Sequence, residues 1–383
     1  MEILLLTQWI LCFITTIYVV LITIYYISWM RLPFFIYKAS DVYSTKVSVI
    51  IPARNEEENI ANCIQDLMKQ TFPKQLMEIL IIDDASTDNT VAIAKEIIHQ
   101  HPEFNIKIIS LNNLPSMNAN KKNAIAIGIR NATGSLMVNT DADCRYSMKW
   151  IETMVGYYEK NNAKFISAPV CFMSDYSFFE KMQTLEFMSL IGIGAAAINT
   201  GIPMMCNGAN IAFERAAYME VNGDINSEGI ASGDDIFLML KIADKYPQGI
   251  HFIKSLDATV YTYAKKTINE FYMQRKRWAS KGMKYTNIPI TAVAMITYFA
   301  NLAWLLNLIL CIFYPTMIPV FIILTLACMC VEIPFLYALA AFFNRRKLIM
   351  IYLPTFIFNI FYVIIIGAMG SIGKYAWKGR IVK

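Results

Sequence analysis

The sequence predicts an α/β domain with a mostly parallel sheet, flanked by transmembrane helices at both ends of the chain. Three observations predict this fold class. The 383 residues are 56% hydrophobic and only 16% charged, which is too apolar for an ordinary soluble domain. Long charge-free runs occupy both ends. Between them, short β-branched runs alternate with stretches of helical periodicity.

The N-terminal segment, residues 1–30, is expected to form one transmembrane helix. No charged residue occurs from Ile3 to Met30, and a crossing needs about 20 apolar residues. A signal peptide is the alternative, but its apolar region is typically about 7–15 residues long and precedes a cleavage site of small residues. Neither feature is present, so we interpret this run as a retained anchor.

Residues 286–372 are expected to form about three further crossings. The charge-free run from Tyr285 to Val331 is long enough for two helices that break near Pro315, and a second run extends from Leu348 to Gly373. Glu332 is the one acid of this region, and an ionisable residue at membrane depth is a functional candidate. Alternatively, its carboxylate reaches towards Arg345.

The basic residues beside these runs predict the orientation, because lysine and arginine near membrane helices tend to stay in the cytoplasm. Arg31 and Lys38 follow the first run, and Lys276 and Arg277 precede the second. Residues 46–284 are therefore expected to be a cytoplasmic domain of a multi-pass protein of the bacterial inner membrane. Four crossings would leave the basic tail outside, so either one hydrophobic run is re-entrant or the tail departs from the rule.

The cysteine count and the net charge exclude other classes. Four of the eight cysteines lie in hydrophobic runs and the others are far apart, so no zinc or disulfide spacing exists. The net charge of +5 is concentrated near the membrane ends, which favours a membrane partner and argues against nucleic acid.

Within the central domain, four apolar runs predict strands at residues 47–51, 78–84, 106–110 and 135–143. Helical patterns lie between them, at Ile60 to Met68, Thr90 to Gln100 and Lys121 to Arg130. This alternation predicts a parallel sheet, whose ligands bind beyond the carboxyl ends of its strands. The segment from Tyr176 to Ile202 predicts either an amphipathic helix at the membrane surface or a buried core helix.

Carboxylates end two of the predicted strands. Asp83 and Asp84 follow one, and Asp141 and Asp143 form an Asp-x-Asp at the end of another. On a strand, alternate side chains share a face, so Asp141 and Asp143 could approach one divalent ion. Mg²⁺ and Mn²⁺ prefer oxygen ligands and bind a few carboxylates together with phosphates. The alternative is that these acids lie in a solvated turn.

Seven segments in order resemble family 2 glycosyltransferases, an inverting family with the GT-A fold. They are IPARNEEENI (51–60), IIDDASTDNT (81–90), KKNAI (121–125), NTDADCR (139–145), CNGAN (206–210), SGDDIFL (232–238) and QRKRW (274–278). The resemblance covers Lys46 to Lys284, about two thirds of the chain.

The resemblance implies a role for each matching residue. Asp143 would contact the metal, with Asp141 on the metal, the donor sugar or the ribose, and Asp83 or Asp84 would hold the uracil or ribose. The other residues expected to bind the donor are Pro52, Arg54, Glu56 and Lys121. Many relatives have tyrosine where Arg54 stands.

By the resemblance, Asp235 aligns with the catalytic base of the family, and Asp234 would be the neighbour that shapes acceptor choice. A base is needed to deprotonate the acceptor hydroxyl. The alternative is that both aspartates cap a helix. Gln274, Arg277 and Trp278 share one helical face; Arg277 would meet the leaving diphosphate and Trp278 the acceptor sugar. A belt of Trp and Arg at the membrane surface is the alternative.

The expected activity is transfer of a hexose from a nucleotide diphosphate, a UDP-sugar, to a membrane lipid or a lipid-linked glycan of the cell envelope. A processive polysaccharide synthase is the second possibility, because it shares the Gln-x-x-Arg-Trp signature. A non-catalytic membrane protein for transport or assembly is the third, although Glu332 is the only charged residue in the C-terminal spans to suggest transport.

Overall fold

The computed structural model describes residues 2–38, 43–111, 121–173, 176–222, 235–282, 287–369, 375–377 and 380–382. The chain forms two compact units. The sheet unit consists of Leu32–Met173 and Ile193–Tyr263, and the helical unit of Met1–Arg31, Ser174–Gly192 and Ala264–Lys383. Residues 174–192 and 264–284, which the sequence assigned to the central domain, thus group with the hydrophobic helices.

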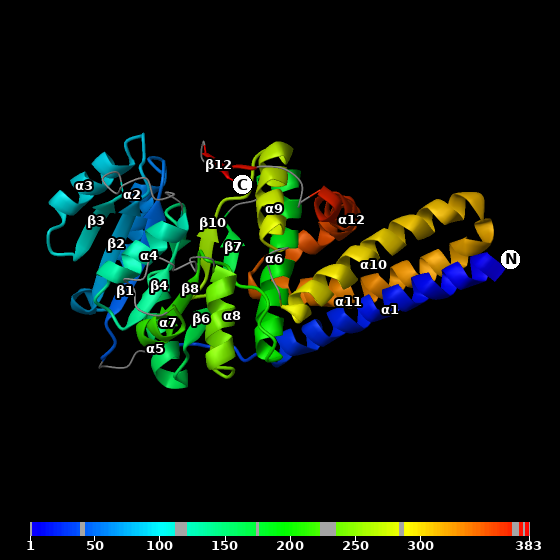
Figure 1. The fold of residues 1–383 in the computed structure, drawn as a ribbon, viewed down its shortest axis with the longest axis horizontal. Helices are drawn as coiled ribbons and strands as arrows, with labels where there is room; N and C mark the ends of the chain where they lie inside the picture. Colours follow the sequence, from blue (N-terminus) through cyan, green and yellow to red (C-terminus); the bar gives the residue numbers. More distant parts are fainter. Residues whose placement is uncertain are drawn as a thin grey trace. The chain divides into compact units, whose positions relative to one another are not determined.

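The sheet unit contains a seven-stranded sheet in the order β3-β2-β1-β4-β8-β6-β9 (Figure 1). Its strands are β1 (Val47–Ala53), β2 (Met77–Asp83), β3 (Ile106–Ser110), β4 (Leu136–Asn139), β6 (Phe165–Ser167), β8 (Ile211–Glu214) and β9 (Ile250–Phe252). Strands β1 to β4 run parallel, and β8 is antiparallel to both of its neighbours. The mostly parallel sheet that the sequence predicted is confirmed.

The predicted strand at 47–51 forms β1, whose residues Val49, Ile50 and Ile51 are fully buried. Such continuous burial is typical of a parallel strand covered on both faces. The helices of this unit are α2 (Ile60–Met68), α3 (Thr90–Gln100), α4 (Lys121–Asn131), α5 (Trp150–Asn161), α7 (Arg215–Asn222) and α8 (Asp235–Lys245), with the short 3₁₀ turn η1 (Lys74–Leu76). A smaller sheet pairs β10 (Val260–Thr262) with β5 (Arg145–Tyr146) and β7 (Val170–Phe172).

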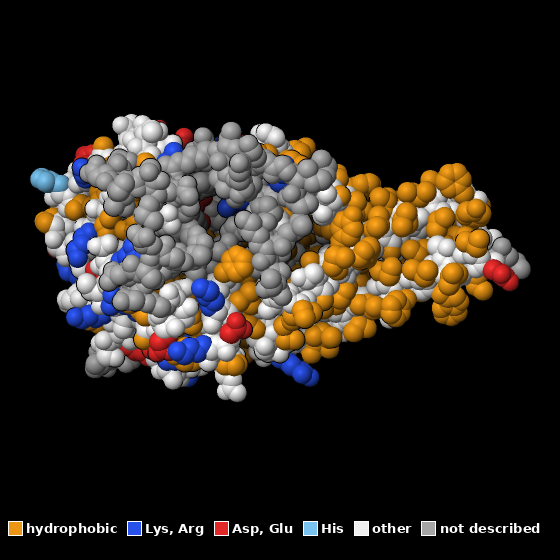
Figure 2. Space-filling model, viewed as in Figure 1, with side chains coloured by type: hydrophobic (Ala, Val, Ile, Leu, Met, Phe, Trp, Pro, Cys, Tyr) orange, Lys and Arg blue, Asp and Glu red, His pale blue; other side chains and the backbone are white. Residues whose placement is uncertain are grey.

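Within the part of the chain that the structure describes, the helical unit contains four helices that are long and apolar enough to cross a membrane. They contain α1 (Glu2–Arg31), α10 (Ile288–Phe313), α11 (Ile318–Phe342) and α12 (Tyr352–Met369), and η2 (Pro315–Met317) and η3 (Arg346–Ile351) precede the last two. Figure 2 shows hydrophobic side chains covering the surface of α1, α10 and α11. The helical unit also contains α9 (Ile268–Gly282) and the hairpin of β11 (Tyr375–Trp377) and β12 (Arg380–Val382).

Helix α6 (Phe178–Asn199) begins in the helical unit. Every residue from 182 to 188 is buried, which matches the predicted core helix better than the surface helix. Glu332 on α11 accepts hydrogen bonds from the hydroxyls of Tyr18 and Tyr352, each at 2.7 Å. This carboxylate therefore links α11 to α1 and α12.

Candidate active site

The carboxyl ends of β1, β2 and β4 meet at one edge of the large sheet. Ala53 at the end of β1 pairs with Asp83, and Ile50 pairs with Asn139, the last residue of β4. Asp84 follows β2 directly, and its backbone N–H donates to the carbonyl of Ala53 at 2.9 Å. The acids that the sequence places after β2 and β4 therefore do lie along one edge.

The loops after β1 and β2 are hydrogen-bonded to each other. Arg54 donates from Nη1 to the carbonyls of Asp84 and Ala85, at 2.5 and 3.0 Å. Asp83 is buried, and its carboxylate accepts the N–H of Ser86 and the hydroxyl of Ser110, at 3.0 and 3.1 Å. Because these contacts fix both loops, Arg54 and Asp83 help to shape the edge of the sheet.

The remaining donor-site candidates occupy the same segments. Pro52 pairs with Ile82 inside the sheet, and the N–H of Glu56 donates to the hydroxyl of Thr90 at 2.7 Å. Lys121 begins α4, but its side chain lies outside the described residues, as does the whole of Asp234.

Asp141 and Asp143 lie in a turn, which corrects the predicted strand at 135–143. Strand β4 ends at Asn139, and the N–H of Cys144 then donates to the carbonyl of Asp141 at 3.2 Å. The alternation of side chains along a strand therefore does not explain how these two carboxylates are presented. The hydroxyl of Thr262 on β10 contacts Asp143 Oδ2 at 3.4 Å.

The turn suits a hard divalent cation that shares its ligands with phosphates. Both aspartates are only partly buried, and they offer carboxylate oxygens, the donors that Mg²⁺ and Mn²⁺ prefer. Among the residues that the structure describes, no group of three His, Cys, Asp or Glu side chains could hold a metal ion alone. The turn offers the donor chemistry of an ion that binds one or two carboxylates together with a diphosphate.

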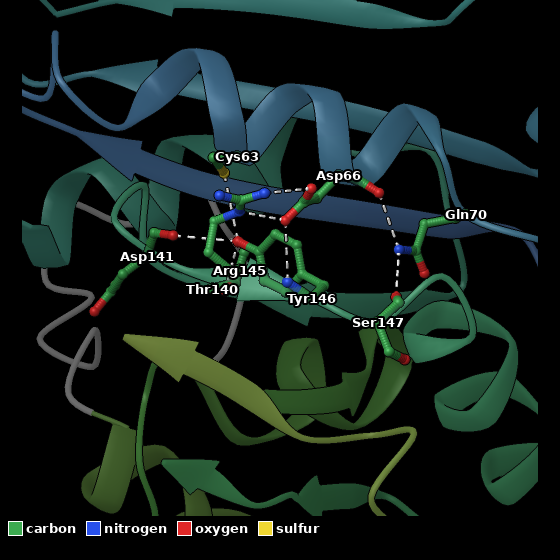
Figure 3. Close-up of polar contacts among 8 residues, drawn as sticks. All are labelled: Cys63, Asp66, Gln70, Thr140, Asp141, Arg145, Tyr146 and Ser147. Atoms are coloured by element: carbon green, nitrogen blue, oxygen red, sulfur yellow. Dashed lines mark hydrogen bonds and ion pairs between the residues drawn. The ribbon is translucent and has the colours of Figure 1, made fainter. Parts of the chain in front are cut away.

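A network that the sequence analysis missed supports this turn (Figure 3). The hydroxyl of Tyr146 donates to the carbonyl of Asp141 at 3.2 Å and lies 3.0 Å from the hydroxyl of Thr140. Arg145 forms two hydrogen bonds with Asp66 on α2, at 2.5 and 2.9 Å. The bidentate pair ties the chain just after Asp143 to α2. Only the tertiary structure brings these residues together, since Asp66 is about 80 positions away along the chain.

Burial keeps the groups of this network protonated. It raises the pKa of Tyr146 well above the ordinary value, so the hydroxyl remains a donor. Burial also raises the pKa of Cys63 to about 12, although a hydrogen bond with Tyr146 opposes the shift. The pKa of Arg145 is raised by its hydrogen bonds to Asp66.

Asp235 is the first residue of α8, and its carboxylate is held by the backbone of the CNGAN segment. Oδ2 accepts the N–H of Gly208 at 2.6 Å. The carbonyl of Gly208 in turn accepts the side-chain amide of Asn139 at 2.7 Å. One residue, Gly208, thus connects the carboxylate of Asp235 to the strand that leads into the Asp141 turn. Oδ1 accepts the N–H of Ile236, the next residue, at 3.1 Å.

Gln274, Arg277 and Trp278 lie on α9 in the helical unit and are half-buried. Their neighbour Arg275, which the sequence analysis did not single out, is buried and forms an ion pair with buried Glu186 on α6. The guanidinium of Arg275 lies 4.2 Å from the ring centre of Trp278. The indole of Trp278 thus packs against a cation, and the ring of Phe187 lies 6.1 Å from it.

This arrangement defines a class: a GT-A-type α/β protein with hydrophobic helices long enough to cross a membrane. Two family profiles match the chain, "Glycosyl transferase family 2" over residues 48–221 and "Glycosyl transferase family group 2" over residues 138–366. The chain belongs to glycosyl transferase family 2.

The chain is similar to two curated relatives and to one solved structure. The chain is 26% identical over 280 residues to a poly-beta-1,6-N-acetyl-D-glucosamine synthase of Staphylococcus epidermidis, covering 70% of this chain and 62% of the relative. It is 33% identical over 116 residues to a dolichyl N-acetyl-alpha-D-glucosaminyl phosphate 3-beta-D-2,3-diacetamido-2,3-dideoxy-beta-D-glucuronosyltransferase of Methanococcus voltae, covering 30% of this chain and 34% of the relative. The matches thus span less than two thirds of either relative.

The solved structure is the mannosyltransferase PcManGT of Pyrobaculum calidifontis in complex with GDP-Man and Mn²⁺. It covers 96% of this chain and all of its own chain, with a TM-score of 0.57 and 17% identity. This likeness shows a shared fold.

Proposed function

We propose that the protein is an inverting glycosyltransferase. It moves a hexose from a nucleotide diphosphate sugar, specifically a UDP-sugar, to a membrane lipid or a lipid-linked glycan. The observation that carries the proposal is the contact series Asn139, Gly208, Asp235. It couples the carboxylate of Asp235 to the strand that leads into the Asp141 turn, so a candidate base and a candidate diphosphate site are held by adjoining backbone.

In the proposed reaction, Asp235 accepts the proton of the acceptor hydroxyl while that oxygen attacks the anomeric carbon. The bond from this carbon to the diphosphate oxygen breaks on the opposite face, which inverts the configuration. A divalent cation, Mn²⁺ or Mg²⁺, held by Asp143 and Asp141 would offset the negative charge that develops on the diphosphate. By the family resemblance, Arg277 would supply a charge-assisted hydrogen bond to a leaving diphosphate, and Gln274 and Trp278 would orient the acceptor.

The donor-binding roles follow the loops after β1 and β2. Asp83 and Asp84 would receive the base or ribose, beside Pro52, Arg54 and Glu56, and Lys121 would approach the phosphates. PcManGT binds GDP-Man, so a guanine nucleotide is the alternative donor that the experiment must include.

The lipid-linked acceptor is supported by the Methanococcus relative, whose name includes a dolichyl N-acetyl-alpha-D-glucosaminyl phosphate, and by the four hydrophobic helices. We place the sheet unit in the cytoplasm and the helices in a bacterial inner membrane, because the flanking basic residues favour that side.

The test measures release of nucleotide diphosphate from membranes supplied with Mn²⁺ and a panel of UDP- and GDP-sugars. Asp235→Asn should abolish release, whereas Asp244→Asn, an exposed aspartate on the same helix, should not change it. Equal rates in wild type and Asp235→Asn would exclude Asp235 as the base. If no donor in the panel is turned over or bound, the result would favour a non-catalytic membrane protein for transport or assembly.

A processive synthase is the second candidate, because the match to the staphylococcal synthase extends over 70% of this chain. Gel analysis of the labelled product separates the two: one discrete glycolipid supports single transfer, and a ladder supports polymerisation.

A further inference from the structure

The helix α12 runs in a different direction from the other three hydrophobic helices. Figure 1 shows α1, α10 and α11 side by side along the same direction, with α12 seen nearly end-on. Helix α1 contacts both α10 and α11, whereas α12 contacts α10, η3 and α9. Length and composition alone do not separate α12 from the other candidates for membrane crossing.

Two contacts with α10 agree with this difference in direction. The ring of Phe356 lies 5.7 Å from that of Trp304, and a Cβ placed on Gly367 would come within 2.5 Å of the Tyr298 ring. At about 1.5 Å per residue, these contacts are about 16 Å apart along α12 but only about 9 Å apart along α10. Two nearly antiparallel helices would advance by similar lengths, so this difference agrees with the different direction of α12 in Figure 1.

The middle of α12 is attached to α6 and α9. The hydroxyl of Tyr362 donates to Glu186 on α6 at 2.6 Å, and Glu186 is paired with Arg275 on α9. The ring of Phe358 lies 5.6 Å from that of Phe271, also on α9. Charged pairs are costly at the centre of a bilayer, and α9 carries several other cations. The middle of α12 thus packs against a charged helix. If α12 crossed the membrane, its middle would instead lie at the apolar centre of the bilayer.

One face of α12 is left for lipid. Leu353, Ile357, Phe361 and Ile365 are spaced four residues apart and are each between 42% and 54% exposed. Residues four apart share one face of a helix. From Tyr352 to Ile366, the other positions of α12 are buried or partly buried. A helix with a single exposed apolar stripe is suited to lie along a membrane surface, with that stripe directed into the acyl boundary.

We propose that α12 lies along the boundary of the bilayer instead of crossing it, so that the chain crosses three times, through α1, α10 and α11. The apolar stripe of α12 contacts lipid in the same leaflet as the cytoplasmic ends of these helices. The hairpin strand β11, which contacts α9, then lies on the same side as α9.

Three crossings also remove the conflict in the charge pattern. With α12 in the boundary, Arg31, Arg345 and the lysines of the C-terminal tail all lie on one side of the membrane, as the bias of basic residues towards the cytoplasm requires. A fourth crossing would place the tail on the opposite side. The proposal is independent of the proposed activity and is tested without it.

The test places one epitope tag at each of three positions in separate full-length variants: after Thr316 between α10 and α11, after Asn344 between α11 and α12, and after Lys383. An impermeant antibody is added to intact and to permeabilised spheroplasts. We expect the Thr316 tag to be reached in intact spheroplasts, and the Asn344 and Lys383 tags only after permeabilisation. Antibody binding to the Lys383 tag in intact spheroplasts, with the Asn344 tag still protected, would overturn the proposal.

A second measurement reads the depth of α12 directly. Spin labels are attached to Leu353→Cys and Ile365→Cys, in a background where the cysteines that are not fully buried (Cys12, Cys206, Cys311, Cys330) are serine. In a crossing helix these positions differ in depth by about 18 Å, from 12 residues at about 1.5 Å each. Relaxation of the two spin labels by oxygen and by a water-soluble nickel complex should instead report similar membrane depths. A depth difference of about 18 Å between the two labels would overturn the proposal.

Discussion

The N–H of Gly208 donates a hydrogen bond of 2.6 Å to Oδ2 of Asp235, although the two residues are 27 positions apart. Gly208 has no side chain to interfere with this approach: a Cβ there would lie 2.9 Å from the same oxygen and 3.3 Å from Cγ. This contact holds Oδ2 of Asp235, and the N–H of Ile236 contacts Oδ1 at 3.1 Å. Position 208 therefore controls the orientation of the proposed base.

Replacing Gly208 by alanine should reduce turnover more than donor binding. The methyl group would displace the Asp235 carboxylate, and a misplacement of about 1 Å can cost about 10²-fold in rate. We expect kcat to fall by about that factor while the Kd for the nucleotide sugar changes little. Steady-state kinetics with parallel calorimetry checks this; an unchanged kcat would show that Gly208 does not orient the base.

Removing the charge of Asp66 should weaken metal binding without removing a metal ligand. Asp66→Asn loses the ion pair with Arg145 that anchors the chain following Asp143. Changes to residues that support metal ligands typically lower affinity about 10–100-fold. The Mn²⁺ concentration for half-maximal activity should rise accordingly, whereas Glu96→Gln, at an exposed site on α3, should leave it unchanged. An Mn²⁺ dependence identical to wild type would contradict this role.

Breaking the buried pair on α6 and α9 should destabilise the helical unit. Glu186→Gln leaves Arg275 buried without its charge partner, and losing one member of a buried pair costs about 3–5 kcal/mol. The double variant Glu186→Leu, Arg275→Met should recover much of this loss, because apolar replacement of a buried pair is often neutral. Thermal unfolding of purified protein in detergent measures both; a double variant less stable than Glu186→Gln would refute the expectation.

Stability should rise with pH above about 8 through Lys254. Its ammonium is buried, donates to the carbonyl of Leu32 at 3.1 Å, and lies 4.6 Å from the ring centre of Phe34. Burial lowers the pKa of Lys254 from 10.5 to about 8. Between these values the unfolded chain binds more protons than the folded one, so raising the pH favours folding; below about 8 both states are charged and the effect is constant.

The measurement for Lys254 is the thermal midpoint in detergent from pH 7 to pH 10. The thermal midpoint of the wild type minus that of Lys254→Met should increase with pH above about pH 8. The same difference for Lys149→Met, at an exposed lysine, should not depend on pH. A flat Lys254 difference would indicate that this ammonium is not desolvated.

Much of the sheet was predictable because strand and helix patterns are local. The runs at 47–51, 78–84 and 106–110 became β1, β2 and β3 with boundaries shifted by a residue or two. The strand expected at 135–143 was too long, because composition does not show where Asn139 ends the ladder and the chain turns. The antiparallel strand β8 was not predicted, since its four residues are too few to give a periodic signal.

The sequence by itself determined the class of this protein: the charge-free runs fixed which helices are apolar enough for a bilayer, and ordered motifs marked the acids along one sheet edge. Only the tertiary structure decided how those residues are held, because the partners come from distant segments. Asp66 reaches Arg145, Gly208 reaches Asp235 and Glu186 reaches Arg275 across 79, 27 and 89 positions. The direction of α12 was undecidable from its sequence for the same reason: hydrophobicity sets whether a helix meets lipid, and packing sets its angle.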